Sequence, residues 1–299
     1  MDKFILKSTK SLNGEINIAG AKNAVLPLMT ACIISPGTYT LNNVPLLRDT
    51  LTMAKLLEMV GAKVNIDGNT FIINTENCNT PYAPYDLVKT MRASVLIWGS
   101  LLSRLSKAKI SFPGGCAIGD RPIDQHLNGF EKIGYETIVK SGYLKSIKTK
   151  EVGGVFRFKM KSVTGTENLI LAAIFGNKKT ILENCALEPE VNDLISFLKS
   201  LGADIKKTKD TIKINPVRSL KKQKKSYEII SDRIEAGTFM YLGCLPSNKI
   251  TINNVDSKTL KDVIKTIKDI GSKIKINKKS ITVTAPKEIN QLKNIETNP

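Results

Sequence analysis

The sequence predicts an α/β protein built from repeated units of about seventy residues, arranged in two domains. Three observations support this. A strand-like run, an amphipathic helix, a glycine and a second strand recur along the chain. Each unit also holds a second helix that is apolar on nearly all sides. Finally, 299 residues exceed the size at which a single hydrophobic core usually stops growing, which makes two domains the expectation.

The amphipathic helices end at glycines spaced roughly seventy residues apart, where a left-handed helix stop is expected. These glycines are Gly61, Gly134, Gly202 and Gly271. Apolar residues precede three of them at helical intervals: Met53, Leu56, Leu57, Val60; Leu194, Phe197, Leu198, Leu201; Leu260, Val263, Ile264, Ile267. Strand-like segments such as 70–73 and 280–284 follow.

The second helix of each unit is predicted over 24–34, 94–103, 169–175 and 239–245, and its apolar surface places it in the core. Polar residues gather just before it, at 20–23, 91–92, 164–168 and 232–235. Free N–H groups and the helix dipole make such starts suitable for anions. For any single helix, ordinary capping is the alternative; the fourfold recurrence favours the functional interpretation.

The segment 113–122, Pro-Gly-Gly-Cys-Ala-Ile-Gly-Asp-Arg-Pro, places Cys116 near Arg121 on a glycine-flanked loop. A neighbouring cation stabilises a thiolate and makes the cysteine a better nucleophile or proton donor. The alternative is a glycine-rich turn with a small apolar residue. By count, Cys116 occupies the place that Asn43 and Asn184 hold in their units, so the second unit has been specialised.

The net charge of +18 favours anionic partners. Aromatic residues make up only 6% of the chain and no nucleic-acid signature occurs, so a small polyanionic substrate fits better than nucleic acid. The lysine-rich run 221–225 is interpreted as a solvated linker. Five cysteines without a C-x-x-C pair, and a single histidine, argue against a disulfide framework or a zinc site. No apolar run could insert into a membrane and no signal segment opens the chain, which predicts a cytoplasmic protein.

Five motifs together resemble the UDP-N-acetylglucosamine 1-carboxyvinyltransferases, the enolpyruvyl transferases that open bacterial peptidoglycan synthesis. They are the segments 20–24, 87–94, 113–126, 162–168 and 232–238. The resemblance implies an inside-out α/β barrel of two domains, with helices inside and sheets outside. It implies a first domain over 22–229 and a partial second domain formed by 1–21 and 230–299. No metal or organic cofactor is implied.

The resemblance also implies a reaction and roles for particular residues. Phosphoenolpyruvate would be protonated, the 3-hydroxyl of UDP-N-acetylglucosamine would add, and phosphate would leave. Lys22 and Arg121 would hold the phosphate and carboxylate, and Asn23 would orient the reacting groups. Cys116 would be the proton donor, the site of a covalent adduct and the target of fosfomycin-type inhibitors. The UDP-sugar contacts would be Arg92, Arg121, Pro122, Ile123, Asp124, Gln125, Ser162, Val163, Thr164 and Gly165. His126 is expected to be structural.

The chain departs from the resembling family at its end. Four repeats are complete where six are expected, and the aspartate that serves the family as general base lies beyond Pro299. We therefore expect a truncated chain with an incomplete second domain, exposed apolar helix faces and little turnover. A non-catalytic UDP-sugar-binding fragment remains an alternative. The shikimate-pathway enolpyruvyl transferase lacks this cysteine loop, and RNA 3′-phosphate cyclase needs a late histidine that is absent here.

Overall fold

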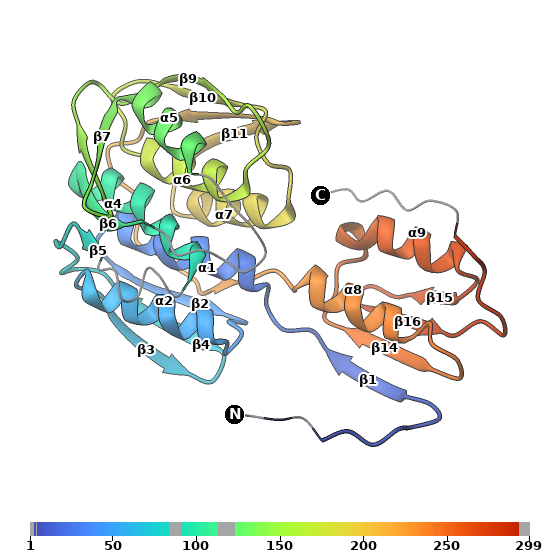
Figure 1. Cartoon of the computed structure of the whole chain (residues 1–299). Coiled ribbons are helices and arrows are strands. Elements are labelled where there is room, and N and C mark those ends of the chain that lie inside the picture. Colours follow the sequence, from blue (N-terminus) through green and yellow to red (C-terminus); the bar gives the residue numbers. More distant parts are fainter. Residues whose placement is uncertain (1–2, 4, 84–90, 113–122, 293–299) are drawn as a thin grey trace. The chain divides into compact units, whose positions relative to one another are not determined.

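The computed structural model describes residues 3, 5–83, 91–112 and 123–292 and divides the chain into two compact units. The large unit comprises residues 22–230, and the small unit comprises 1–21 together with 231–299. Each unit packs its helices against sheets of four strands (Figure 1). The predicted α/β class is confirmed. The predicted site residues Cys116, Arg121 and Pro122 lie outside the described residues.

Three repeats of one strand–helix–strand–strand order build the large unit. The first strand of each repeat pairs antiparallel with the last, and the last pairs antiparallel with the middle one. The first repeat is β2 (Thr38–Asn42), α2 (Arg48–Met59), β3 (Lys63–Asp67) and β4 (Thr70–Asn74). The second is β6 (Lys107–Ser111), α5 (Asp124–Ile133), β7 (Tyr135–Lys140) and β8 (Tyr143–Lys148). The third is β10 (Thr180–Glu183), α7 (Pro189–Ser200), β11 (Asp204–Thr208) and β12 (Thr211–Asn215).

A short parallel strand completes each sheet. β5 (Tyr82–Ala83) joins β6, β9 (Gly154–Arg157) joins β10, and β13 (Tyr227–Glu228) returns to join β2. The small unit repeats this plan once. There β1 (Asn13–Asn17) pairs parallel with β14 (Lys249–Asn253), beside β16 (Ser280–Thr284) and β15 (Lys273–Ile276). In each unit, therefore, a parallel strand pair joins segments that are far apart in the sequence: β2 with β13 in the large unit, and β1 with β14 in the small unit.

The four glycines predicted to end the amphipathic helices all have positive φ, between 96° and 113°. Only glycine adopts this conformation without steric cost, which explains the regular spacing. Asparagines with φ near 60° recur before the helices, and each Nδ2 donates to a backbone carbonyl that follows the parallel strand: Asn43 to Ile229, Asn184 to Phe158, Asn254 to Ile18. In three of the four sheets, therefore, an asparagine at the equivalent position holds the parallel strand in place.

The second helices form the core of the large unit, as predicted. They are α1 (Lys22–Ala31) with the 3₁₀ turn η1 (Cys32–Ile34), α4 (Ile97–Leu105) preceded by the 3₁₀ turn η2 (Arg92–Leu96), and α6 (Val163–Ala173). Residues 24–31 and 165–173 are all buried. Trp98 on α4 is fully buried, with its ring centroid 4.6 Å from that of Phe130. The apolar stripes on the amphipathic helices α2 and α7 are also buried.

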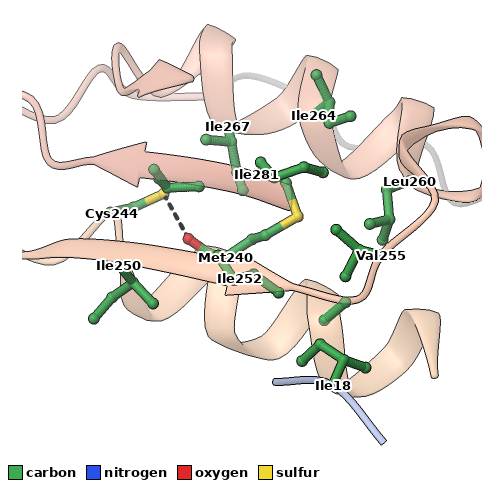
Figure 2. Packing of buried hydrophobic residues seen from close by; sticks show 12 residues of the cluster. Ile18, Met240, Cys244, Ile250, Ile252, Val255, Leu260, Ile264, Ile267 and Ile281 are labelled. Carbon is green, nitrogen blue, oxygen red and sulfur yellow. Dashed lines mark hydrogen bonds between the residues drawn. The ribbon is translucent and has the colours of Figure 1, made fainter. Parts of the chain in front are cut away.

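The small unit buries a separate cluster between its sheet and two helices, α8 (Arg233–Leu242) and α9 (Lys261–Asp269). The 3₁₀ turn η3 (Ser257–Leu260) precedes α9. Figure 2 shows Met240 pointing into this cluster toward Ile281, with Cys244 beside it; the Cys244 thiol donates to the Met240 carbonyl at 3.5 Å.

The helix α8 is only partly buried within its unit, although six of its ten residues are apolar. Ala236, Gly237 and Met240 are buried, whereas Ile234 and Tyr241 are 56% and 40% exposed. Leu245, just beyond the helix, is 51% exposed. Apolar side chains on α8 and just after it are therefore partly exposed in the small unit taken by itself.

This difference in burial predicts that two alanine substitutions, one in α8 and one just after it, lower the stability of the small unit by different amounts. Met240→Ala is expected to destabilise the small unit by roughly 2 to 5 kcal/mol, because Met240 is fully buried. Leu245→Ala should cost less than about 1 kcal/mol. Hydrogen exchange of the β14 and β16 amides measures both effects. Equal protection in the two variants would show that the cluster does not depend on Met240.

Candidate functional site

The three core helices of the large unit run in the same direction. The turn η2, which leads into α4, contacts both α1 and α6, and α4 contacts η1 at the end of α1. The ends of the three helices also lie together, because Ile34, Leu105 and Phe175 line one cavity. Asn168, in the middle of α6, accepts from the Gly99 amide at 2.8 Å and donates to the Val95 carbonyl at 3.1 Å. Near the helix ends, Arg104 of α4 donates to the Ile33 carbonyl, just after α1, at 2.9 Å. Hence α1, η2 with α4, and α6 all begin at the same end of the large unit.

Several predicted site residues therefore lie at one end of the large unit. Lys22 and Asn23 are the first two residues of α1, and Arg92 opens η2. Ser162 caps α6, whose first turn contains Val163, Thr164 and Gly165. Parallel helix starts combine free N–H groups with the positive ends of three dipoles, a setting that favours anions.

The start of α6 is held by a hydrogen bond from the Gly165 amide to the Ser162 Oγ, at 3.2 Å. Gly165 is buried, and a Cβ there would lie 2.8 Å from the Ser162 Oγ and 3.1 Å from the Phe158 ring. A larger residue at this position would therefore displace the Ser162 side chain. Ser162, Val163 and Thr164 are partly exposed, so this turn offers both backbone and side-chain groups to a ligand.

The predicted contacts Ile123, Asp124 and Gln125 lie at the start of α5, and their side chains face different surroundings. Ile123 and Gln125 are buried, whereas Asp124 is exposed. The Gln125 amide accepts from the backbone of Lys159 and Met160 at 2.8 and 3.3 Å and donates to the Met160 carbonyl at 3.0 Å. Gln125 therefore holds the segment that leads into Ser162.

Asp49, a residue that no sequence pattern singled out, lies beside the predicted Lys22. The Lys22 Nζ is 3.0 Å from the Asp49 Oδ2, and both side chains are partly exposed. Asp49 belongs to the first turn of α2, the helix that packs against α1. The pair is separated by 27 residues, so helix or strand periodicity could not have revealed it.

The described cysteines are poor nucleophiles. Cys32, Cys78, Cys185 and Cys244 are all buried and free. Burial raises the pKa of each of these thiols, that of Cys185 to about 12. A thiolate at neutral pH is therefore not expected at these four positions. Cys116 remains the candidate by sequence, outside the residues that the structure describes.

Three acids at the starts of α6 and α7 form a second group that the sequence did not predict. Glu167 is 1% exposed, and its Oε1 has no hydrogen-bond partner within the described ranges. Burial raises the pKa of Glu167 well above its usual range, and the nearby Glu190 and Glu188 raise it further. Both effects favour the protonated form of Glu167 over the ionised one. In the sequence, the only sign of this group was that Glu167 is a charged residue within an otherwise apolar predicted helix.

His126 has the surroundings of a core residue. It is buried in α5, and its ring lies parallel to that of Trp98, with centroids 6.4 Å apart and an interplanar angle of 5°. This agrees with the structural role expected for it. Within the described ranges, no group of three or more His, Cys, Asp or Glu side chains could hold a metal ion. The helices described there are also too short or too polar to cross a membrane.

Residues 6–299 match the family described as EPSP synthase (3-phosphoshikimate 1-carboxyvinyltransferase). The chain is 43% identical over 301 residues to the UDP-N-acetylglucosamine 1-carboxyvinyltransferase of Trichlorobacter lovleyi, covering 100% of this chain and 71% of the relative. It is 41% identical over 302 residues to UDP-N-acetylglucosamine 1-carboxyvinyltransferase 1 of Clostridium acetobutylicum, covering 100% of this chain and 72% of that relative.

Solved structures agree on the fold. The enolpyruvyl transferase NikO from Streptomyces tendae superposes with a TM-score of 0.81 at 19% identity, covering 92% of this chain and 66% of that one. EPSP synthase from Acinetobacter baumannii gives 0.75 at 17% identity, covering 96% and 68%. The chain spans less than two thirds of the NikO chain and about 71% of the Trichlorobacter relative. By fold and by sequence, the chain belongs to the EPSP synthase family of enolpyruvyl transferases and, within it, to the UDP-N-acetylglucosamine 1-carboxyvinyltransferases.

Proposed function

We propose that this protein transfers the enolpyruvyl group of phosphoenolpyruvate to the 3-hydroxyl of UDP-N-acetylglucosamine and releases phosphate, a step of peptidoglycan synthesis. The observation that supports this most is the parallel arrangement of α1, α4 and α6, which brings Lys22, Asn23, Arg92 and the turn 162–165 to one end. Both substrates carry phosphate groups, and helix starts with cationic side chains bind such groups well.

In the proposed mechanism, cations and a thiol act on phosphoenolpyruvate. Lys22 and Arg121 hold its phosphate and carboxylate and balance the charge that builds on them. Cys116 donates a proton to the methylene carbon, and Asn23 orients the reacting groups. The sugar hydroxyl then adds to the neighbouring carbon, and phosphate leaves the tetrahedral intermediate. An electrophilic epoxide of the fosfomycin type would alkylate the same thiol.

The UDP-sugar is proposed to contact Arg92, the segment 121–125 and the turn 162–165. The role of Gln125 in this proposal is narrower, because its side chain is already bonded to the backbone of Lys159 and Met160. Gln125 would act indirectly, by holding the polypeptide that leads into the turn. We further propose that the two units are the two domains of the enzyme and that it works in the cytoplasm.

Phosphate release and calorimetry test the proposed function together. Measurable phosphate release from the two substrates, abolished or strongly reduced by Cys116→Ser, would support the transfer and overturn the expectation of little turnover. Heat of binding with UDP-N-acetylglucosamine but no phosphate release would favour the alternative, a non-catalytic UDP-sugar-binding protein. A folded protein that releases no phosphate and gives no heat with the UDP-sugar would contradict both functions.

Gly165→Ala tests the proposed UDP-sugar contact at the start of α6. The added methyl group should displace the Ser162 side chain, whose Oγ would lie only 2.8 Å from the alanine Cβ. Stability should change by less than about 1 kcal/mol, because the better helix propensity of alanine offsets the disturbed cap. The affinity for UDP-N-acetylglucosamine should fall roughly tenfold, the equivalent of about 1.4 kcal/mol. Calorimetry measures the affinity, and an unchanged value would remove this turn from the proposed site.

A further inference from the structure

We propose that Asp49 is a positioning residue for the Lys22 ammonium group and thereby sets the affinity for phosphoenolpyruvate. The inference rests on the proposed function, because it concerns the anion that Lys22 would hold. It concerns a residue on a different helix from any of the proposed substrate contacts. Asp49 would act through Lys22 and need not touch the substrate.

The contact itself is close and lies at the surface of the large unit. The Lys22 Nζ and the Asp49 Oδ2 are 3.0 Å apart, and the two side chains are 41% and 32% exposed. Lys22 is the first residue of α1, and Asp49 is the second residue of α2. Two packed helices therefore present opposite charges at the end where α1 begins.

The carboxylate is fixed by the helix that bears it. Next to it, Thr50 is fully buried, and its Oγ1 donates to the Pro45 carbonyl at 2.7 Å. The same oxygen accepts from the Leu47 amide at 3.0 Å, which closes the first turn of α2. Asp49 thus extends from a turn whose backbone is held on both sides, so it can serve as a fixed reference point for a flexible lysine.

The chemistry of the ammonium group makes this arrangement useful. A lysine side chain has four rotatable bonds, so holding it in one conformation costs entropy. If a fixed carboxylate already orders the side chain in the free protein, less entropy is lost when substrate binds. An ammonium group carries three N–H donors, so a bond to Asp49 is compatible with further bonds to an anion. The carboxylate also repels an approaching anion. We infer that positioning outweighs this repulsion.

A purely structural role is the competing explanation. An exposed ion pair contributes little to stability, and an acid in the first turn is favourable in any helix. Asp262 offers a matched control, because it is also the second residue of its helix, α9. If the first-turn charge alone mattered, Asp49→Ala and Asp262→Ala would behave alike.

The test is a calorimetric titration of phosphoenolpyruvate into the full chain without UDP-N-acetylglucosamine, so that no transfer adds heat to the binding signal. Asp49→Ala should raise the dissociation constant roughly tenfold. Asp49→Asn, which keeps an acceptor for the lysine, should raise it less, and Asp262→Ala should leave it unchanged. In a Lys22→Met background, Asp49→Ala should have no further effect, because Asp49 acts only through Lys22. The affinity for the UDP-sugar should be the same in all variants.

The outcomes separate this inference from the proposed function. Wild-type protein that binds no phosphoenolpyruvate overturns both. Wild-type binding combined with unchanged or tighter binding by Asp49→Ala overturns only the positioning role. An equal loss in the Lys22→Met background also overturns it, because the effect would then not pass through Lys22.

Discussion

Replacing Asn168 with alanine is expected to lower the free energy of unfolding of the large unit by roughly 2 to 5 kcal/mol. Asn168 is fully buried in α6, where its amide bonds to the Gly99 N–H and to the Val95 carbonyl at the start of α4. Alanine would leave the buried Gly99 N–H without a partner, which costs about 1 to 3 kcal/mol. It would also remove one of the two hydrogen bonds to the Val95 carbonyl, which accepts from the Ile97 amide as well, at about 1 kcal/mol. Few side chains in the described core join two helices through two hydrogen bonds in this way.

Denaturant unfolding followed by fluorescence measures this effect cleanly. Trp98 is the only tryptophan of the chain and is buried in the large unit, so its emission reports that unit alone. Asn192→Ala, on the exposed face of α7, is the matched control and should cost less than about 1 kcal/mol. A loss below about 1 kcal/mol for Asn168→Ala would mean that water or a shift of nearby groups satisfies the Gly99 amide. Because Asn168 aligns α6 with α4, the variant should also bind UDP-N-acetylglucosamine more weakly.

The local rules of the sequence predicted most of the fold. Glycine spacing identified the repeats, because a left-handed helix stop accepts glycine almost alone, and all four glycines have positive φ. Apolar residues on every side placed α1, α4 and α6 in the core. The same rule did not fully describe α8, since burial depends on which elements surround a helix as well as on its sequence.

The candidate site was less predictable, because its contacts join residues that are far apart in the chain. Lys22 was singled out by its motif, but its partner Asp49 lies on another helix and in an ordinary first-turn position. Gln125 was assigned to the ligand, whereas its amide is bonded to backbone 34 and 35 residues away. Glu167 was counted among the polar residues at the start of a core helix, yet it is buried near Glu188 and Glu190. Tertiary packing decides each of these roles.

The stability of the large unit is expected to depend on pH through Asp193, a buried acid on α7. Burial raises the pKa of Asp193 from 3.8 to about 6, and Glu190 adds to the shift, while hydrogen bonds from the Tyr227 hydroxyl and the Ile230 amide oppose it. The Tyr227 Oη lies 2.8 Å from the carboxylate. Tyr227 and Ile230 belong to the segment through which the chain leaves the large unit. Asp193 binds this segment through hydrogen bonds, but its ionised carboxylate is destabilised by burial.

The direction of the pH effect follows from the proton balance. Between pH 3.8 and about 6 the folded protein binds this proton and the unfolded chain does not, so stability falls as the pH rises through that window. Above it both states are ionised, and the folded state carries the full cost of the buried charge. A shift of this size corresponds to about 3 kcal/mol, since one pKa unit is about 1.4 kcal/mol.

Asp193→Asn should therefore stabilise the large unit at pH 8 by up to about 3 kcal/mol and have little effect near pH 4. The asparagine Oδ1 still accepts from Tyr227, so the main hydrogen bond survives the loss of charge. Trp98 fluorescence in denaturant at a series of pH values measures the difference. Asp204→Asn, at an exposed position on β11, should change stability by less than about 0.5 kcal/mol at every pH. If Asp193→Asn destabilised the unit equally at pH 4 and pH 8, the ionised carboxylate would be a net source of stability, and its hydrogen bonds would outweigh its burial.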